Sequence, residues 1–182
     1  GEAVSTLNLG AHRVINISAA AAPSFLSPNG REQAAPNFRS SLRDWGVRDE
    51  FVLYVPGGFD ARKNFERLFA AYGQLPERLR QRYQLVITGK LDKGRADLLM
   101  SYARAAGLTA DDIVLVGYVT DDRLRDLYGH AALFVFPSLH EGFGLPVLEA
   151  MTCCAPVIAA NTSSLPEVVG SPSALFDPYD PL

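Results

Sequence analysis

The chain has 182 residues, of which 48% are hydrophobic and 20% are charged, and its formal net charge is −3. This length predicts one compact domain, and the composition is that of a globular protein, which excludes the disordered and fibrous classes. The slightly acidic balance argues against a nucleic-acid partner, because domains that bind nucleic acids are usually basic.

The two cysteines, Cys153 and Cys154, are adjacent and cannot form a disulfide framework, so a reducing, cytoplasmic setting is expected. The sequence contains no apolar stretch of about 18 residues, the length that suggests a transmembrane helix. It begins with Gly1, without an initiating methionine or the layout of a signal peptide, and it ends abruptly at Leu182. These two ends are typical of a fragment of a longer protein.

Two irregular segments come first along the chain. Residues 12–17 fit a short strand, and residues 19–37 are rich in Ala, Pro, Ser and Asn without a sustained period, which predicts a linker. The apolar run 51–55 then predicts a strand that ends at Pro56-Gly57-Gly58. A helical pattern follows it and places four apolar side chains on one face: Phe65, Leu68, Phe69 and Tyr72.

The alternation of strand and helix patterns continues to the end of the chain. The predicted strands are 84–88, 113–116, 133–136 and 156–159, and the predicted helices are 94–106, 121–131 and 146–152. Such alternation indicates right-handed crossovers and a parallel sheet covered on both faces, that is, an α/β fold with a Rossmann-like, doubly wound sheet. Ligands of such sheets bind beyond the carboxyl ends of the strands, so the loops there are the places to search.

Several familiar sites are absent from these loops. No strand is followed by Gly-x-Gly-x-x-Gly, and Gly89-Lys90 lacks the upstream glycine and the Ser or Thr of a P-loop. The three histidines show no metal-ligand spacing, no Asp-x-Asp occurs, and no Gly-x-Ser-x-Gly elbow is present. A phosphate bound here therefore requires Lys, Arg and backbone amides to neutralise its charge, and we expect no metal ion and no cofactor.

The loop after the first strand has the composition of an anion site. Gly57 and Gly58 let the backbone approach a ligand closely, and the cations Arg62 and Lys63 stand at the start of the following helix. Cations normally avoid a helix N-terminus, so an anionic ligand would explain them. The alternative is a plain turn with solvated cations.

The loop and helix over residues 140–149 hold two carboxylates, Glu141 and Glu149. Pro146 suits a first helical turn, so the amides of residues 143–145 are expected to face the cleft. Ionised carboxylates accept hydrogen bonds from sugar hydroxyls. Alternatively, Glu141 caps the helix and Glu149 is a solvated helical residue.

Two further loops are weaker candidates. The backbone around Val119 has the position to hydrogen-bond a nucleobase edge, although the sequence itself favours Thr120 or Asp121 as a simple N-cap. The polar segment 161–167 enters a short helix, and it either lines the same cleft or caps that helix.

In this order, the segments resemble the C-terminal, donor-nucleotide domain of retaining glycosyltransferases of the GT-B fold, glycosyltransferase family four. The resemblance covers roughly residues 40–180 and is strongest in the string Pro137-Ser-Leu-His-Glu141-Gly-Phe-Gly-Leu-Pro-Val-Leu-Glu149-Ala-Met151, which matches the family's Glu-x7-Glu signature. Gly57-Gly58 with Arg62-Lys63-Asn64 is similar to the family's phosphate loop. The sequence of these motifs is similar to that of bacterial mannosyltransferases of polysaccharide assembly.

The resemblance assigns roles to these residues. It implies that Glu149 holds the ribose hydroxyls, that Glu141 contacts the donor sugar, and that Lys63 with Arg62 stabilises the diphosphate leaving group, as metal-independent catalysis requires. The resemblance assigns the remaining donor contacts to the glycines after strand 51–55, to the backbone after strand 113–116 and to the residues just before helix 146–152. These residues are Gly57, Gly58, Val119, Gly142, Phe143, Gly144 and Leu145. Lys63→Ala is expected to lower the transfer rate far more than stability, because an exposed loop cation packs little.

The sequence departs from the family pattern in two places. Gly58 stands where many members carry Arg, for which Arg62 would compensate, and Cys154 stands where Gly is usual, which suggests a slightly different turn. The fold also closes two domains around its substrates. Residues 1–40 are interpreted as the end of the N-terminal domain and a linker, and residues 41–182 as the donor domain, incomplete at its C-terminus.

The resulting prediction is the donor half of a hexosyltransferase that acts in polysaccharide or glycoconjugate synthesis, with mannose linked to GDP or UDP as the expected donor. The acceptor, a sugar or a lipid-linked sugar, would bind mainly to the N-terminal domain, and the longer enzyme would work in the cytoplasm, with a peripheral membrane association at the inner face. This chain alone would transfer little or no sugar. The alternatives are a non-catalytic nucleotide-binding module and a sugar-nucleotide epimerase of the same fold.

Overall fold

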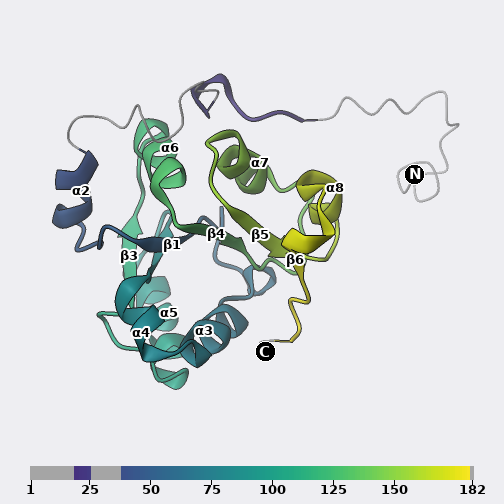
Figure 1. Cartoon of the computed structure of the whole chain (residues 1–182). Coiled ribbons are helices and arrows are strands. Elements are labelled where there is room, and N and C mark those ends of the chain that lie inside the picture. Colours follow the sequence, from purple (N-terminus) through teal and green to yellow (C-terminus); the bar gives the residue numbers. More distant parts are fainter. Residues whose placement is uncertain (1–18, 26–37, 181–182) are drawn as a thin grey trace, which may run out of the picture.

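The computed structural model describes residues 19–25 and 38–180, and its centre is one parallel sheet (Figure 1). The sheet has six strands in the order β3-β2-β1-β4-β5-β6. Their bounds are β1 Phe51–Tyr54, β2 Gln84–Thr88, β3 Ile113–Gly117, β4 Leu133–Phe136, β5 Val157–Ala160 and β6 Leu175–Phe176. The predicted Rossmann-like, doubly wound sheet is therefore confirmed, while β6 was not predicted.

The strand order reverses between β1 and β4, which are neighbours in the sheet although β2 and β3 lie between them in the sequence. Leu53 is in register with Val86 on one side and with Phe134 on the other. In doubly wound sheets this reversal opens a crevice beyond the carboxyl ends of the two central strands. Lys63 lies in the loop after β1 and Glu141 in the loop after β4, so both residues lie at the edge of the sheet where this crevice is expected.

Helices cover both faces of the sheet (Figure 1). One face carries the helices that connect β1 to β2 and β2 to β3, and the other carries those that follow β3, β4 and β5. The first group is α3 Phe65–Gln74, α4 Glu77–Arg82 and α5 Lys93–Ala105; the second is α6 Asp121–His130, α7 Leu145–Thr152 and α8 Leu165–Val169. Because both faces are covered, the strands are continuous apolar runs, as the sequence suggested.

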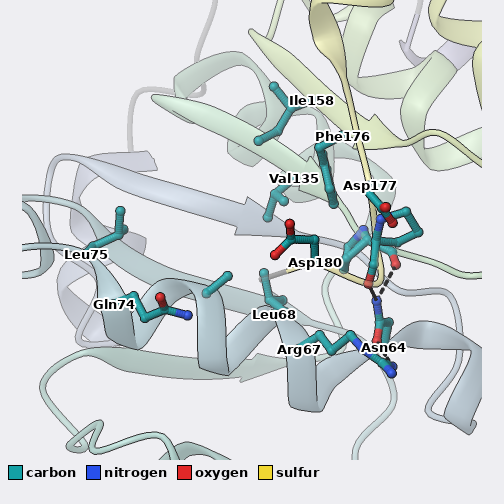
Figure 2. A pocket seen from close by; sticks show the side chains of 13 residues that line it. Asn64, Arg67, Leu68, Gln74, Leu75, Val135, Ile158, Phe176, Asp177 and Asp180 are labelled. Atoms are coloured by element: carbon teal, nitrogen blue, oxygen red, sulfur yellow. Dashed lines mark hydrogen bonds between the residues drawn. The ribbon is translucent and has the colours of Figure 1, made fainter. Parts of the chain in front are cut away.

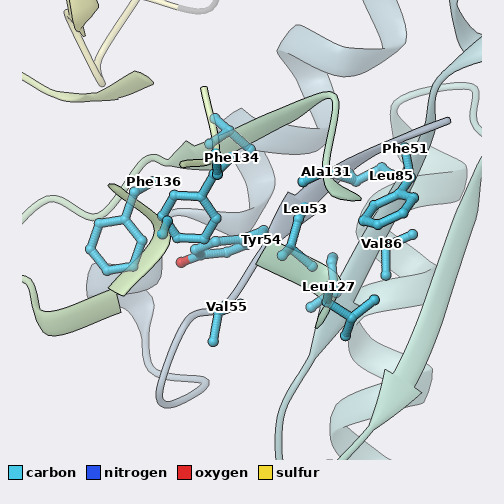
Figure 3. Packing of buried hydrophobic residues seen from close by; sticks show 14 of the residues in the cluster. Phe51, Leu53, Tyr54, Val55, Leu85, Val86, Leu127, Ala131, Phe134 and Phe136 are labelled. Carbon is cyan, nitrogen blue, oxygen red and sulfur yellow. The ribbon is translucent and has the colours of Figure 1, made fainter. Parts of the chain in front are cut away.

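The centre of the core is β1, whose side chains pack between those of β2 and β4 (Figure 3). Phe51, Leu53 and Tyr54 have no exposed surface. The Tyr54 ring packs on Phe136 of β4 with ring centroids 6.0 Å apart, and its hydroxyl donates a hydrogen bond of 2.7 Å to the backbone carbonyl of Lys63. The core thereby fixes the backbone of the loop that carries the candidate phosphate ligand.

The segment before the sheet packs against α6. Residues 38–44 form helix α2 (Phe38–Asp44), and Pro23–Phe25 form a short 3₁₀ helix. Phe25 is buried, and its ring meets that of Tyr128 edge-on with centroids 6.0 Å apart. The expected strand at 12–17 and most of the expected linker lie outside the described residues.

The left-handed turn after α7 corrects one expectation. Cys154 has φ 61°, its N–H donates to the carbonyl of Met151, and the N–H of Ala155 donates to the carbonyl of Ala150. These two bonds define the Schellman motif, in which glycine is the usual residue. Cys154 therefore adopts the turn that a glycine would adopt, rather than a different one.

Candidate functional site

The loop after β1 is a 3₁₀ turn, Ala61–Lys63, with Asp60 at its N-cap. The Asp60 side chain accepts a hydrogen bond of 3.1 Å from the backbone N–H of Arg62 and forms an ion pair of 2.9 Å with the Arg62 guanidinium. The hydrogen bond from Arg62 lowers the pKa of Asp60, so this carboxylate stays charged. Arg62 is exposed and pairs with Asp60, so its environment differs from that of Lys63.

Lys63 points inward and pairs with Glu141. Its ammonium Nζ lies 2.5 Å from Oε1 of Glu141, and the two side chains are 8% and 14% exposed. The ring of Phe136 lies beneath the ammonium, with its centroid 6.0 Å away. The expectation of an exposed loop cation is wrong, because the 3₁₀ turn directs Lys63 into the crevice while Arg62 remains outside.

Two serines after β5 hold the backbone of Glu141. Its N–H donates to Oγ of Ser163 at 3.0 Å, and its carbonyl accepts from Oγ of Ser164 at 3.2 Å. Thr162 adds a third bond, from its hydroxyl to the carbonyl of Ser138. The polar segment 161–167 thus lies against the Glu141 loop, so its position beside the crevice is explained by these contacts.

Helix α7 begins at Leu145 after Gly144, which has φ 92°. A Cβ on Gly144 would lie 2.7 Å from Cδ2 of Leu165, so both backbone conformation and space require glycine here. Pro146 occupies the first turn, as predicted, and no side chain of the described residues caps this helix. Glu141 therefore does not cap α7. Pro146 has no N–H, and the N–H groups of Val147 and Leu148 donate to the carbonyl of Gly144, so Leu145 is the residue of this first turn whose N–H faces no acceptor among the described residues.

Glu149 lies one turn after the start of α7 and is half-buried. Its Oε2 accepts a hydrogen bond of 3.1 Å from the hydroxyl of Tyr128. Burial raises the pKa of Glu149, the Tyr128 hydrogen bond lowers it, and the charge of Asp121 raises it. Glu149 is therefore held by the protein rather than solvated like an ordinary surface residue of a helix.

A cavity of about 500 Å³ opens where the loops after β1, β2 and β3 meet. Gly57, Gly58 and Val119 line it together, as the sequence predicted for one cleft. It is also lined by residues that the sequence reasoning did not select for binding: Val55, Phe59, Thr88, Gly89, Lys90, Arg95, Tyr118, Asp121 and Leu124. Gly89, Lys90 and Tyr118 directly follow β2 or β3, and this position is the sequence signal that could have found them.

The predicted residues fall into two neighbouring groups. Lys63, Glu141 and Glu149 do not line this cavity. A Cβ on Gly58 would lie 3.8 Å from Cε of Lys63, and the charge of the cavity residue Asp121 acts on Glu149. Gly142, Phe143 and Leu145 belong to the loop and first turn between the two glutamates.

A second, apolar cavity of about 420 Å³ lies between α3 and strands β4 to β6 (Figure 2). Leu68, Val135, Ile158 and Phe176 surround it, and Asn64 lies at one end. The Asn64 amide donates to the carbonyls of Pro137 and Pro178, at 3.0 and 2.9 Å. This side chain ties together the loops after β1, β4 and β6.

Within residues 19–25 and 38–180, no cluster of three or more His, Cys, Asp or Glu side chains is suited to holding a metal ion. In the same ranges, no helix combines the length and the apolar character needed to cross a bilayer.

Comparison with known proteins gives close matches over almost the whole chain. The chain is 39% identical over 179 residues to an Escherichia coli protein described as serotype-specific mannosyltransferase WbdA, which is 98% of this chain and 22% of that protein. It is 36% identical to the Escherichia coli O-antigen chain mannosyltransferase B, over 98% of this chain and 45% of that protein. The chain thus spans less than half the length of these two relatives.

Solved structures agree on the fold. A glycosyltransferase from Rickettsia africae has a TM-score of 0.80 and 16% identity, over 99% of this chain and 47% of that one. Sucrose-phosphate synthase from Thermosynechococcus elongatus has a TM-score of 0.65 and 29% identity, over 79% of this chain and 36% of that one. The sequence profile described as "Glycosyl transferases group 1" matches residues 40–181, and the chain therefore belongs to the group 1 glycosyl transferase family.

Proposed function

We propose that this chain is the donor-binding half of a retaining hexosyltransferase, which transfers a hexose from a nucleoside diphosphate sugar to an acceptor in polysaccharide or glycoconjugate synthesis. Residues 41–182 form the donor domain and residues 1–40 belong to the end of the N-terminal domain and a linker. Mannose is the proposed sugar, because the relatives WbdA and O-antigen chain mannosyltransferase B are described as mannosyltransferases.

The observation that carries the proposal is the buried ammonium of Lys63 at the strand-order reversal, next to the cavity lined by the loops after β1, β2 and β3. The ammonium has three donor protons, and Glu141 accepts one of them, so donor capacity remains for a phosphate. The start of α7 adds the N–H of Leu145 and the positive end of a helix dipole. A diphosphate between Lys63 and this helix start would be neutralised from two sides.

These groups suit the chemistry of glycosyl transfer. When the bond from the anomeric carbon to the diphosphate breaks, negative charge grows on the departing phosphate and positive charge on the sugar ring. Lys63 and the amides of residues 143–145 would stabilise the phosphate, while Glu141 contacts the sugar and balances the buried ammonium. Fixed charges of this kind lower the barrier without reorganising during the reaction.

The two remaining parts of the donor follow from the same placement. Glu149 accepts hydrogen bonds from the ribose hydroxyls, and the base occupies the cavity lined by Gly57, Gly58 and Val119. The acceptor binds mainly to the N-terminal domain of the longer protein, so this chain alone transfers little or no sugar. A cytoplasmic location, with peripheral attachment of the longer enzyme to the membrane, belongs to the same proposal.

Calorimetric titration and thermal unfolding of this chain with GDP, UDP, ADP and their sugar conjugates test the proposal. A ligand at about 100 times its dissociation constant stabilises the protein by about 2.7 kcal/mol, which raises Tm by several degrees at this size. We expect one nucleoside diphosphate to bind, and Lys63→Met to abolish its binding. Lys93→Met, which removes an exposed cation at the start of α5, is the matched control. Absence of binding for every nucleotide would contradict the proposal.

A further inference from the structure

Tyr128 is a buried side chain with a polar end that reaches the candidate donor site. It lies on α6 with no exposed surface, and its hydroxyl donates to Oε2 of Glu149 on α7 at 3.1 Å. A carboxylate has two oxygens and about four lone-pair sites, so one hydrogen bond from Tyr128 leaves Glu149 able to accept others. The contact therefore orients Glu149 without consuming its capacity to bind a ligand.

Aromatic neighbours fix the Tyr128 ring from two directions. The ring of Phe25 meets it edge-on at a centroid distance of 6.0 Å, and the ring of Phe134 on β4 does so at 5.3 Å. Edge-to-face pairs favour one relative orientation of the two rings. The hydroxyl is consequently held at one place above α7, and Glu149 is held with it.

The charges around Glu149 show why such an anchor is needed. Burial raises the pKa of Glu149, and the charge of Asp121 at the start of α6 raises it further, while the hydrogen bond from Tyr128 lowers it. Burial also raises the pKa of the Cys153 thiol to about 11 and keeps the phenol of Tyr128 protonated, so both stay neutral at physiological pH. Among these neighbours, Tyr128 is the group that favours the ionised carboxylate.

We propose that Tyr128 is a positioning residue for nucleotide binding: its hydroxyl holds the Glu149 carboxylate in the orientation in which it accepts hydrogen bonds from the two ribose hydroxyls. The inference rests on the proposed function, because it takes the ligand of Glu149 to be the ribose of a nucleoside diphosphate. Tyr128 itself does not touch the ligand. It acts through Glu149, so its loss affects only ligands that carry the hydroxyls.

The test compares Tyr128→Phe with the wild-type chain by calorimetric titration. The probes are whichever of GDP, UDP and ADP binds most tightly and the 2′,3′-dideoxy form of the same nucleotide. We expect Tyr128→Phe to weaken the ribonucleotide about tenfold, as loss of a hydrogen bond to a charged group implies, and to change the affinity for the dideoxy nucleotide less than about twofold. Equal weakening of both nucleotides, or of neither, would overturn the proposal.

Tyr72→Phe is the matched control. Tyr72 is also buried, on the face of the sheet away from α7, and its hydroxyl donates to the backbone carbonyls of Tyr83 at 2.6 Å and of Asp112 at 3.3 Å. This variant loses the hydrogen bonding of a buried hydroxyl as Tyr128→Phe does, but it should bind both nucleotides as the wild type does. A general loss of stability would affect the two variants and the two nucleotides alike, and would therefore be recognised.

A pH profile gives a second readout that a packing role would not change. Since the Tyr128 hydrogen bond lowers the pKa of Glu149, its removal should move the acid limb of ribonucleotide binding to higher pH, while the profile of the dideoxy nucleotide stays in place. An unshifted acid limb would contradict the proposal. If no nucleoside diphosphate bound to the wild-type chain, the proposed function itself would fail; ribonucleotide binding that is indifferent to Tyr128→Phe would leave that function intact and refute this inference alone.

Discussion

The ammonium of Lys63 lies 2.5 Å from a carboxylate oxygen of Glu141, although 78 residues separate them in the sequence. The strand order explains the encounter, because β1 and β4 are neighbours in the sheet and their following loops emerge side by side. Each side chain neutralises the other in a poorly hydrated place. Two groups proposed to act on a ligand are thus also partners in the fold.

This pairing predicts that Lys63→Met lowers both stability and nucleotide binding. Removing one partner leaves the other charge buried without compensation, which should cost about 3 kcal/mol of unfolding free energy in urea. The double variant Lys63→Met/Glu141→Gln should recover most of that stability, because no unpaired charge is left, but it should not recover nucleotide binding.

Arg62→Met serves as the comparison, because the exposed Arg62 pairs with the exposed Asp60. Exposed pairs contribute little, so this variant should unfold near the wild-type urea concentration. A Lys63→Met protein as stable as Arg62→Met would show that the buried pair has no structural weight.

A second prediction concerns Glu149→Gln and its dependence on pH. Burial raises the pKa of Glu149 in the folded chain, so the unfolded state loses this proton first as pH rises, and the folded state is progressively disfavoured. Glutamine keeps an acceptor for Tyr128 but carries no charge. The variant should match the wild type near pH 4, exceed it in Tm as pH rises through the raised pKa of Glu149, and bind nucleotide poorly throughout. A Tm difference that is constant with pH would refute this explanation.

Gly144→Ala should destabilise the chain. The alanine would have to adopt φ 92° and would place its Cβ 2.7 Å from Leu165, so we expect a loss of about 2 to 3 kcal/mol in urea unfolding. Gly142→Ala is the control, because nothing lies within 4 Å of its added Cβ and it is exposed. Equal stability of the two alanine variants would contradict the requirement for glycine at the start of α7.

Cys154→Gly should stabilise the chain. Relief of the left-handed conformation gains about 1 to 2 kcal/mol, and the greater freedom of glycine in the unfolded state offsets part of this, which leaves about 0.5 to 1 kcal/mol. Cys154→Ala keeps the strained φ and should unfold at nearly the wild-type temperature. Differential scanning calorimetry of the three proteins measures the order, and a Tm of Cys154→Gly below that of Cys154→Ala would reverse the expectation.

Sequence pattern predicted most of the elements that have a buried run, although it missed helix α2, which buries Phe38, Ser41 and Leu42. Gln84–Thr88 is buried at all five positions, and its predicted bounds are those observed. Helix α4 (Glu77–Arg82) has no buried residue, and β6 consists of two residues that are only partly buried, so neither produces a periodic signal. Their positions depend on the neighbouring elements rather than on their own composition.

The same distinction applies to the candidate site. Loop glycines and charges after strands marked Gly57, Lys63 and Glu141 as candidates, and the structure brings Lys63 and Glu141 into contact. The sequence could not show that Lys63 is buried, since Arg62 beside it has the same charge and a different direction. The 3₁₀ turn determines that Lys63 is buried and Arg62 exposed. Ser163 is recognised as a partner of Glu141 only from contacts between distant segments of the chain.

The packing of Phe25 on Tyr128 also bears on mutational tolerance. The family match begins at residue 40, so a survey guided by that boundary would regard position 25 as freely variable. Phe25 is 3% exposed, and it contacts the ring that holds Glu149. Substitutions at position 25 should be depleted under selection for activity as strongly as those in the sheet, although this position lies outside the family match.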